Sequence, residues 1–393
     1  MMKVFFNRFA TINNPLRIFF LCGSNYNNNT IKVDLNGRKY EIDDKRKVLQ
    51  KFLEETYKDK NFRSIILEDN FMFSDKSRRH LNYNHINLKS LKSIELLTSL
   101  YSDYVVIIHE SFSTAAEIGM FSTSEFINSK LMILTPNEYS VEEDYISGFM
   151  KLSYQNRYYT SHNIKTIYYN PGIYNFHISD QVRKLHTFFI DNEINGALAK
   201  NLSECLDVLT SKNISFGKKQ GIHRELNNFY QVVGSKKINV VFNSNDLIAY
   251  LIALFNINSF RQEFISVLDM SHLKRDNEAN RRKSLFKEGT EIVEKYFKKA
   301  IYNTLSTDIP NIKKEYGDPK NIDSFINFSI NHQVVAFKEC ISYYLYILYA
   351  LSYINIVNKS TRFSITNSFS PVYEEYKDLV QEIKGTKKLW SQK

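Results

Sequence analysis

A short segment in the first third of the chain holds the residues best suited to do chemistry. Residues 105–119 (VVIIHESFSTAAEIG) begin as an apolar run typical of a buried strand, pass through a Ser/Thr-rich stretch and enter a predicted helix that carries Glu117 in its first turns. In open α/β sheets, ligands bind at the carboxyl ends of the strands. A carboxylate at that place is a candidate nucleophile.

A second acid, Glu95, lies in the helix predicted before that strand, eight residues ahead of Asp103. The connections of such a sheet could bring both carboxylates to one crevice with Gly23 and Ser24 at its floor. Glycosidic chemistry uses an acid pair in which one carboxylate attacks or stabilises the sugar carbon and the other moves protons or orients a hydroxyl. An alternative has equal support from position alone: Glu95 is solvated, and Glu117 only complements the positive end of its helix dipole.

The first half of the chain alternates strand and helix patterns. Asp43 and Asp44 are suited to cap a helix, and Asn36-Gly37 within residues 30–42 indicates an inserted hairpin. Strands are predicted at residues 17–23, 63–67, 103–108, 130–134 and 166–169, and helices at residues 45–57, at residues 88–101 and around Glu117. This order predicts an α/β fold with a doubly wound, mostly parallel, Rossmann-like sheet, in a catalytic domain of residues 1–185.

The second half, residues 186–393, is predicted to form a mainly helical, basic domain. Helical patterns cover residues 251–268, 288–305 and 334–353, followed by two short strands within residues 354–366 and a last helix over residues 372–383. Helix, hairpin and helix in this order are compatible with a winged-helix element and equally with ordinary packing. The apolar segment 340–357 has no charged residue but many Tyr, Ser and Asn residues, so a buried helix is favoured over a membrane span.

The net charge of +10 lies mainly in the second half and invites a nucleic-acid interpretation. The chain is also rich in Asn, Lys, Ile, Tyr and Phe, which AT-rich coding DNA enriches whatever the function, so the bulk charge is discounted. Runs of charged residues usually form solvated faces, however, so the cluster of basic residues within 274–283 is weak evidence by itself. The three cysteines are far apart and predict neither a disulfide framework nor a metal site. No signal-peptide pattern opens the sequence, and a cytoplasmic location is expected. The candidate nucleic-acid contacts are Lys274, Arg275, Arg281, Arg282 and Lys283.

Four segments together resemble a known family. Residues 17–24 (RIFFLCGS), 67–69 (LED), 93–97 (SIELL) and 109–122 (HESFSTAAEIGMFS) are similar to the nucleoside 2-deoxyribosyltransferase-like effectors encoded beside retron reverse transcriptases in bacterial anti-phage defence. The resemblance covers about the first 170 residues and implies a deoxyribosyltransferase-like fold. It implies that Glu117 is the nucleophile and that Glu95 lines the sugar pocket. The candidate substrate contacts in the similar segments are Cys22, Gly23, Ser24, Asp69, Ser113, Thr114 and Gly119.

The chain also departs from that family near Glu117. Phe112-Ser113 replaces a Pro-Gly pair, and Ser111 stands where the transferases proper have an aspartate, which argues against free deoxynucleosides as substrates. Nicotinamide leaves NAD as a neutral base from a cationic ring and needs no prior protonation, so NAD hydrolysis is the favoured reaction. NAD is then the substrate, and no separate cofactor or metal is expected.

The resemblance also implies partners. A retron reverse transcriptase and its RNA-linked DNA would hold the toxic enzyme inactive, and a pocket shared within a homo-oligomer is a further expectation. Two other functions stay open from the sequence. One is an N-glycosidase or deoxyribosyltransferase that acts on nucleotides or nucleic-acid bases, and the other is a non-enzymatic adaptor that senses a nucleotide and binds nucleic acid.

Overall fold

The chain divides into two compact units in a computed structural model, and each unit combines segments from several parts of the sequence. The parallel-sheet unit contains residues 16–67 and 98–209, and the mixed-sheet unit contains residues 1–15, 68–97 and 210–393. The division therefore differs from the single boundary expected at residue 185. The structure describes residues 3–23, 30–35, 38–70, 91–109, 111–137, 164–179, 182–206, 211–219, 226–234, 237–266, 278–330, 336–357 and 362–383.

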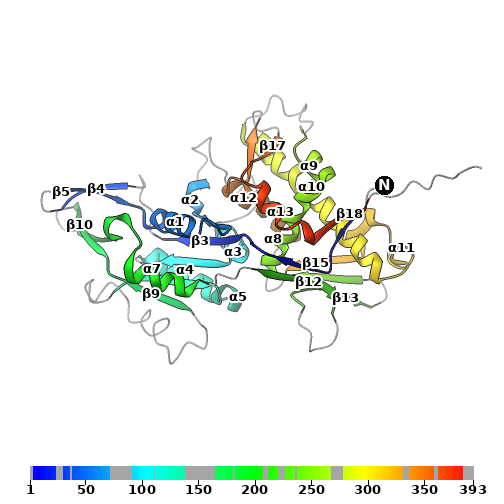
Figure 1. The fold of residues 1–393 in the computed structure, drawn as a ribbon, viewed down its shortest axis with the longest axis horizontal. Coiled ribbons are helices and arrows are strands. Elements are labelled where there is room, and N and C mark those ends of the chain that lie inside the picture. The colour runs from blue at the N-terminus through cyan, green and yellow to red at the C-terminus, as the bar shows by residue number, and fades with distance from the viewer. Residues whose placement is uncertain are drawn as a thin grey trace, which may run out of the picture. The chain divides into compact units, whose positions relative to one another are not determined.

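The parallel-sheet unit is built on a five-stranded sheet in which every neighbouring pair is parallel (Figure 1). In chain order the strands are β3 (Arg17–Cys22), β6 (Phe62–Ile65), β7 (Tyr104–Ile108), β8 (Leu131–Pro136) and β9 (Lys165–Tyr169), and their order across the sheet is β6-β3-β7-β8-β9. The prediction of a parallel sheet with intervening helices is confirmed. The strand order reverses between β3 and β7, and open α/β sheets bind ligands at the carboxyl ends of the strands at such a point.

Helices cover both faces of this sheet because its strands are apolar on both sides. On one face, Leu21 and Val106 belong to the same core cluster as Leu49 of α1 (Lys45–Thr56) and Leu202 of α7 (Gly196–Cys205). On the other face, the ring of Phe20 contacts that of Phe121 in α4 (Phe112–Ser122), with centroids 6.0 Å apart. The remaining short helices of this unit are α5 (Glu125–Asn128) and η4 (Ile190–Asn192). Two further helices, α2 (Leu67–Asn70) and α3 (Leu91–Tyr101), contain residues of both units.

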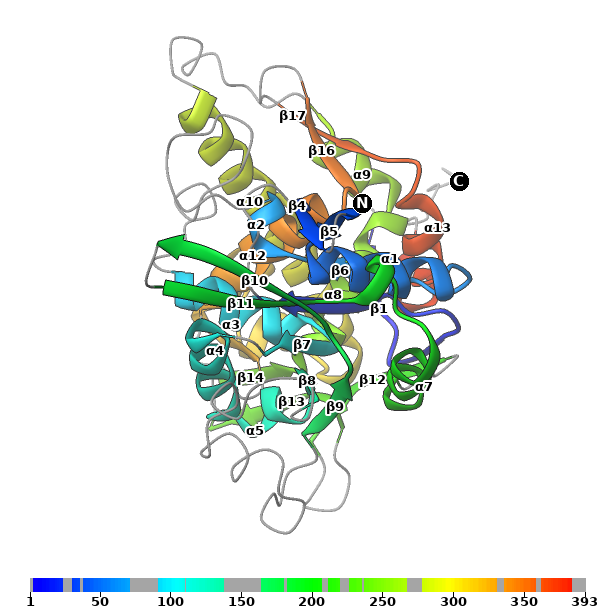
Figure 2. The ribbon, with the colours of Figure 1, turned by 90° about the vertical axis from the view of Figure 1, so that its left-hand side faces the viewer.

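Two hairpins extend from the parallel-sheet unit. β4 (Thr30–Leu35) and β5 (Arg38–Asp43) pair with Leu35 opposite Arg38, so two residues join them, as the Asn-Gly signal predicts. β10 (Gly172–Ser179) and β11 (Val182–Phe188) form a second antiparallel pair, which Figure 2 shows as two long strands side by side. The sequence pattern did not predict this second hairpin.

The mixed-sheet unit contains a second five-stranded sheet that the sequence did not predict. Its strand order is β15-β14-β13-β12-β2, with both parallel and antiparallel neighbours. β2 comes from the first residues of the chain and pairs with β12, which explains why residues 1–15 belong to this unit. The strands are β2 (Phe9–Ile12), β12 (Lys212–Lys218), β13 (Asn228–Val233), β14 (Lys237–Phe242) and β15 (Ile326–Ile330).

Helices pack around this sheet largely where the sequence predicts them. The buried helix expected at residues 334–353 is α12, and the two strands expected after it form the hairpin of β16 and β17. The last helix expected at residues 372–383 is wrong, because residues 380–383 form β18, which pairs with β1. The elements are β1 (Lys3–Phe6), α8 (Ser244–Ala253), η5 (Leu254–Asn256), α9 (Asn258–Phe264), α10 (Glu278–Asp308), α11 (Ile312–Glu315), η7 (Pro319–Ser324), α12 (Phe337–Ala350), β16 (Ile354–Val357), β17 (Arg362–Ile365), α13 (Ser370–Glu374), η8 (Lys377–Leu379) and β18 (Val380–Ile383).

The apolar helix α12 is buried within its unit. It is 14 residues long, and its buried positions include three tyrosines. Across the described ranges, no helix has both the length and the apolar character needed to cross a membrane.

Candidate functional site

The first part of the candidate site is the carboxyl end of β3, where Gly23 follows Cys22. A Cβ placed on Gly23 would lie 3.3 Å from the side-chain stem of Arg46 and 3.5 Å from Cβ of Ile108 at the end of β7. The absence of a side chain at Gly23 thus lets the ends of β3, β7 and α1 approach one another. The Cys22 thiol is buried at 5% exposure, and Ser24 lies outside the described residues.

The second part is the start of α4, directly after β7. Ser111 caps the helix: its hydroxyl accepts from the backbone N–H of Thr114 at 3.3 Å, and its own N–H donates to the Thr114 hydroxyl at 3.0 Å. This reciprocal arrangement is a capping box. The predicted substrate contact Thr114 is buried, so its hydroxyl serves the start of the helix.

His109, the first residue after β7, is held by the same cap. Its Nδ1 lies 3.2 Å from the Thr114 hydroxyl oxygen, which itself donates to the Ser111 carbonyl at 2.8 Å. Burial lowers the pKa of His109, which favours a neutral ring. Because the Thr114 proton is already directed to the carbonyl, the ring N–H at Nδ1 is the donor in the His109 contact. Nε2 is then left as the acceptor nitrogen of the ring.

Glu117 lies in the second turn of α4, because the helix begins at Phe112. The side chain is half-buried, and its Oε2 is a buried atom. The electrostatic effect of a helix N-terminus falls off within the first turn. A carboxylate placed only to complement the dipole would therefore be expected closer to Ser111, and the structure favours the interpretation that Glu117 serves another purpose.

Two more predicted contacts lie on the same helix. Ser113 is exposed in its first turn. Gly119 is also exposed, and a Cβ placed on it would meet no atom within 4 Å. Packing inside the protein does not require glycine at position 119, so the open space beside it is available to a bound molecule.

The predicted partner acid Glu95 and the predicted contact Asp69 belong to the mixed-sheet unit, whereas Glu117 belongs to the parallel-sheet unit. Burial raises the pKa of Glu95, and the nearby carboxylate of Glu68 raises it further. Asp69 in α2 is half-buried and is one of the charges that act on the buried phenol of Tyr346. The pairing of Glu95 with Glu117 stays a prediction.

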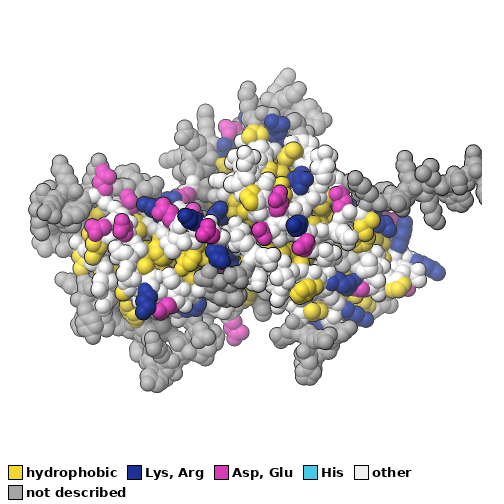
Figure 3. Space-filling view, in the orientation of Figure 1, with side chains coloured by type: hydrophobic (Ala, Val, Ile, Leu, Met, Phe, Trp, Pro, Cys, Tyr) yellow, Lys and Arg dark blue, Asp and Glu magenta, His cyan; other side chains and the backbone are white. Residues whose placement is uncertain are grey.

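The candidate nucleic-acid contacts fall partly on α10. Arg282 forms an ion pair with Glu278 at 2.6 Å, Arg281 is half-buried and Lys283 is exposed. Lys274 and Arg275 lie outside the described residues. On the face drawn in Figure 3, Lys and Arg side chains are interspersed with Asp and Glu over the described surface. A nucleic-acid role for the basic cluster stays a prediction.

A group of buried charges at the start of α1 was not predicted from the sequence. Asp44 caps the helix as predicted, accepting from the N–H of Arg46 at 2.8 Å, but it also pairs with the Arg46 guanidinium at 2.7 Å. Both side chains of this pair are at most 3% exposed. Lys45 donates to the Thr187 hydroxyl at 2.7 Å, and burial lowers the pKa of Lys45 well below its ordinary value despite the opposing effect of Asp44. The only signal was the run of five charged residues over 43–47, two acids followed by three bases, which also fits a solvated helix start.

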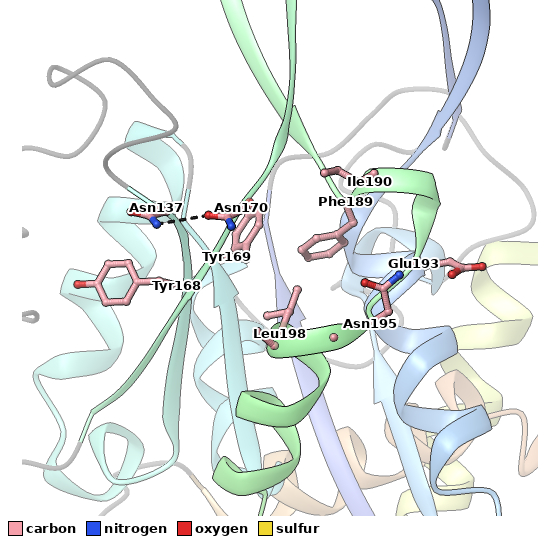
Figure 4. Close-up of a pocket in the computed structure, with 11 residues that line it drawn as sticks. Asn137, Tyr168, Tyr169, Asn170, Phe189, Ile190, Glu193, Asn195 and Leu198 are labelled. Carbon is pink, nitrogen blue, oxygen red and sulfur yellow. Dashed lines mark hydrogen bonds between the residues drawn. The ribbon is translucent and has the colours of Figure 1, made fainter.

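A pocket of about 370 Å³ lies at the same carboxyl edge of the sheet, beyond the ends of β8 and β9. Asn137 and Asn170 directly follow these two strands, and Phe189, Glu193 and the first residues of α7 complete the lining (Figure 4). None of the residues predicted for the site lines this pocket. Its walls come from several separate segments, and no motif in the sequence joins them.

Together, the fold and the site define an α/β protein with a half-buried carboxylate and a pocket at the ligand-binding edge of a parallel sheet. The family model described as STM3845 retron effector protein matches residues 43–281, which is more than half of the chain. The chain belongs to this family of retron effectors. The matched segment includes Glu117 and the pocket. No curated protein matches the chain.

Proposed function

We propose that this retron effector acts in anti-phage defence by cleaving the N-glycosidic bond of NAD, with Glu117 as the nucleophile. The supporting observation is the position of Glu117 in the helix that leaves the carboxyl end of β7, with its Oε2 buried. Ligands of open α/β sheets bind at this edge. The resemblance to deoxyribosyltransferase-like effectors assigns the same role to the same residue.

The reaction needs little from the protein beyond a placed carboxylate. A Glu117 oxygen attacks C1′ of the nicotinamide ribose through an oxocarbenium-like transition state, which the negative charge stabilises. The C1′–N bond breaks with its electron pair staying on the ring nitrogen, so nicotinamide leaves as a neutral molecule. Water then cleaves the glycosyl ester, which gives ADP-ribose, releases a proton and restores the carboxylate.

The neutral His109 suits this chemistry. A cationic imidazole at the end of β7 would disfavour a developing positive charge on the sugar, whereas burial lowers the pKa of His109 and favours the neutral ring. Its expected acceptor nitrogen, Nε2, is suited to orient a water or a sugar hydroxyl.

The test is to incubate the purified chain with NAD and separately with deoxynucleotides, and to measure released base by chromatography. We expect nicotinamide from NAD with the native chain and with Glu125→Gln, a matched change of an exposed acid on α5. Glu117→Gln should lose nearly all release while keeping the same circular dichroism spectrum. Release from deoxynucleotides alone would move the proposal to the other N-glycosidase function, and no release from either substrate class would favour the adaptor.

We further propose that a retron reverse transcriptase and its RNA-linked DNA hold the effector inactive. Membership of the retron effector family supports association with a retron system, and the basic second half of the chain offers a surface for the nucleic acid. Expression of the effector alone should deplete cellular NAD, and co-expression of the complete retron should prevent the depletion. Equal depletion in both strains would contradict this arrangement.

A further inference from the structure

The pocket beyond β8 and β9 has no part in the proposed attack by Glu117. Its volume of about 370 Å³ is at the small end of the range for ligand sites, which is roughly 300–1,000 Å³. It lies wholly within the parallel-sheet unit. Its size is suited to one nucleoside rather than to a complete dinucleotide.

Two aromatic side chains, Tyr169 and Phe189, lie at the base of the pocket, and each is only 3% exposed. Their rings lie 5.0 Å apart at 60°, whereas the ring of Tyr168 points to the other side of β9 (Figure 4). Lys45 lies 3.3 Å from the Tyr169 hydroxyl, and the Thr187 hydroxyl lies 3.4 Å from it. These contacts fix the Tyr169 ring before any ligand arrives. The base of the pocket is therefore preformed and apolar, as is usual for sites that bind small molecules.

The polar groups of the lining are mostly side-chain amides. Asn137 donates from Nδ2 to Oδ1 of Asn170 at 3.3 Å, in an exposed contact, as Figure 4 shows. A long, exposed hydrogen bond is readily exchanged for bonds to a ligand. A carboxamide both donates and accepts, and asparagine pairs in this way with the N6 amino group and N7 of adenine.

The charge of the lining excludes some ligands. Glu193 supplies the one carboxylate among the lining residues, and these include no lysine or arginine. A phosphate inside the pocket would be repelled and unpaired. A ribose or an amino group, in contrast, offers donors to the Glu193 carboxylate. The pocket is therefore suited to the base and sugar of a nucleotide, with its phosphates outside.

The position of the pocket distinguishes between the two ends of NAD. β9 lies two strands from β7, and strands are spaced about 4.8 Å apart, so the ends of these strands lie about 10 Å apart along the sheet edge. The pocket is lined by α7, which covers the opposite face of the sheet from α4. A nicotinamide ring in the pocket would place the reacting C1′ away from the helix that carries Glu117. An adenine in the pocket leaves the pyrophosphate to span that distance.

We propose that this pocket binds the adenosine end of the dinucleotide, as a second subsite beside the reactive carboxylate. The role as a substrate subsite rests on the proposed function, whereas adenosine binding itself does not. The walls come from β9, η4, α7 and residues that adjoin them or follow β8, all in one unit, so the full chain can be tested without its partners.

The first experiment titrates adenosine, inosine and nicotinamide riboside into full-length Glu117→Gln by calorimetry. We expect adenosine to bind at least about tenfold more tightly than nicotinamide riboside, and inosine to bind more weakly than adenosine because it replaces the amino donor with an acceptor. Ala197 is exposed and lines the pocket, so Ala197→Trp should fill the pocket and remove adenosine binding. Lys200→Trp, at an exposed position on the same helix, is the matched control.

Asn170→Ala is a second variant, which removes a proposed ligand contact without adding bulk. It should also weaken the binding of adenosine. Equal binding of adenosine and nicotinamide riboside would overturn the proposal, as would adenosine binding that survives Ala197→Trp in a folded protein.

Turnover of NAD separates this inference from the proposed function. In the active chain, Ala197→Trp should raise KM for NAD at least about tenfold with kcat little changed, because it removes binding remote from the reacting bond. Nicotinamide release with an unchanged KM would refute the subsite and leave the role of Glu117 standing. Adenosine binding through the pocket without any nicotinamide release would refute the proposed hydrolysis and support a nucleoside-binding pocket.

Discussion

The buried ion pair between Asp44 and Arg46 gives a direct test of what holds the candidate site together. Asp44 has two roles: its carboxylate caps α1, and it neutralises a guanidinium that is only 3% exposed beside Gly23. Asp44→Asn keeps an oxygen that can accept from the Arg46 N–H but removes the charge. The variant therefore isolates the electrostatic role.

Breaking a buried pair by removing one partner costs about 3–5 kcal/mol, since the remaining charge stays buried without compensation. The loss of unfolding free energy caused by Asp44→Asn should fall in this range. Asp44→Ala should cost about 1 kcal/mol more, because the helix cap is also lost. Both values are a large part of the roughly 5–15 kcal/mol that stabilises a typical domain.

Hydrogen exchange measured by mass spectrometry suits a chain of two units, because each peptide reports its own region. Amides of α1 and β6 should lose roughly 100-fold or more of their protection in Asp44→Asn, since 1.4 kcal/mol is tenfold. Amides of α12 in the other unit serve as the internal control. Asp44→Asn combined with Arg46→Met should recover most of the protection. A loss below tenfold, or a double variant as unstable as the single one, would refute the reasoning.

Three other changes test the site. Gly119→Ala should stabilise α4 by about 0.5–1 kcal/mol in thermal unfolding, because its Cβ meets nothing within 4 Å, yet it should reduce nicotinamide release; unchanged release would show that no substrate approaches there. Burial lowers the pKa of His109 below its ordinary 6.5, so the unfolded chain takes up the proton first and native stability falls as pH drops below about 6.5. His109→Asn should lose less stability than the native chain between pH 8 and pH 5, which urea unfolding midpoints of both proteins would measure. An equal loss in the two proteins would contradict the reasoning. Burial raises the pKa of Glu95 above its ordinary 4.5, so its stabilising contribution is complete at lower pH and is lost as pH rises through the shifted value. Glu95→Gln should match the native midpoint near pH 4 and exceed it at pH 7, and the opposite order at pH 7 would contradict the sign.

The parallel sheet was predictable because its strands leave a signal that is independent of their partners. β3, β7 and β8 are short apolar runs buried on both faces, and periodic helices separate them. The β4 and β5 hairpin was equally local, since its two-residue connection carries the turn residues itself.

The mixed sheet was missed because its pairings are far apart in the sequence. Residue 10 in β2 pairs with residue 214 in β12, and β14 pairs with β15 across the whole of α10. Single strands of this sheet, such as the alternately buried β14, do not show from the sequence which segment lies beside them. The interleaved division into units follows from these pairings, so a boundary drawn along the sequence could not reproduce it.

The same distinction between local and distant signals applies to the site. Glu117 could be proposed from one segment, because a strand, a cap and a helix occur in direct succession. The burial of Arg46 could not be predicted in this way, since its side chain packs beside Gly23, which is distant in the sequence. The pocket residues gave no signal because they come from several segments, from Asn137 to Leu198, that no local pattern joins.

The backbone at the sheet edge adds a constraint on what the two parts of the site can bind together. The N–H of His109 donates to the Leu134 carbonyl at 2.8 Å, and the N–H of Asn137 donates to the Tyr169 carbonyl at 2.8 Å. The ladder therefore continues past the last residue of β7 and of β8, and it links the start of α4 to the pocket through hydrogen-bonded backbone. Such a connection fixes the ends of β7 and β9 about 10 Å apart, given the usual strand spacing. Under the proposed function, a substrate that uses both places must extend at least that far. A nucleoside bound in the pocket would leave the start of α4 empty, so the pocket would contribute binding energy to the reaction only for a dinucleotide.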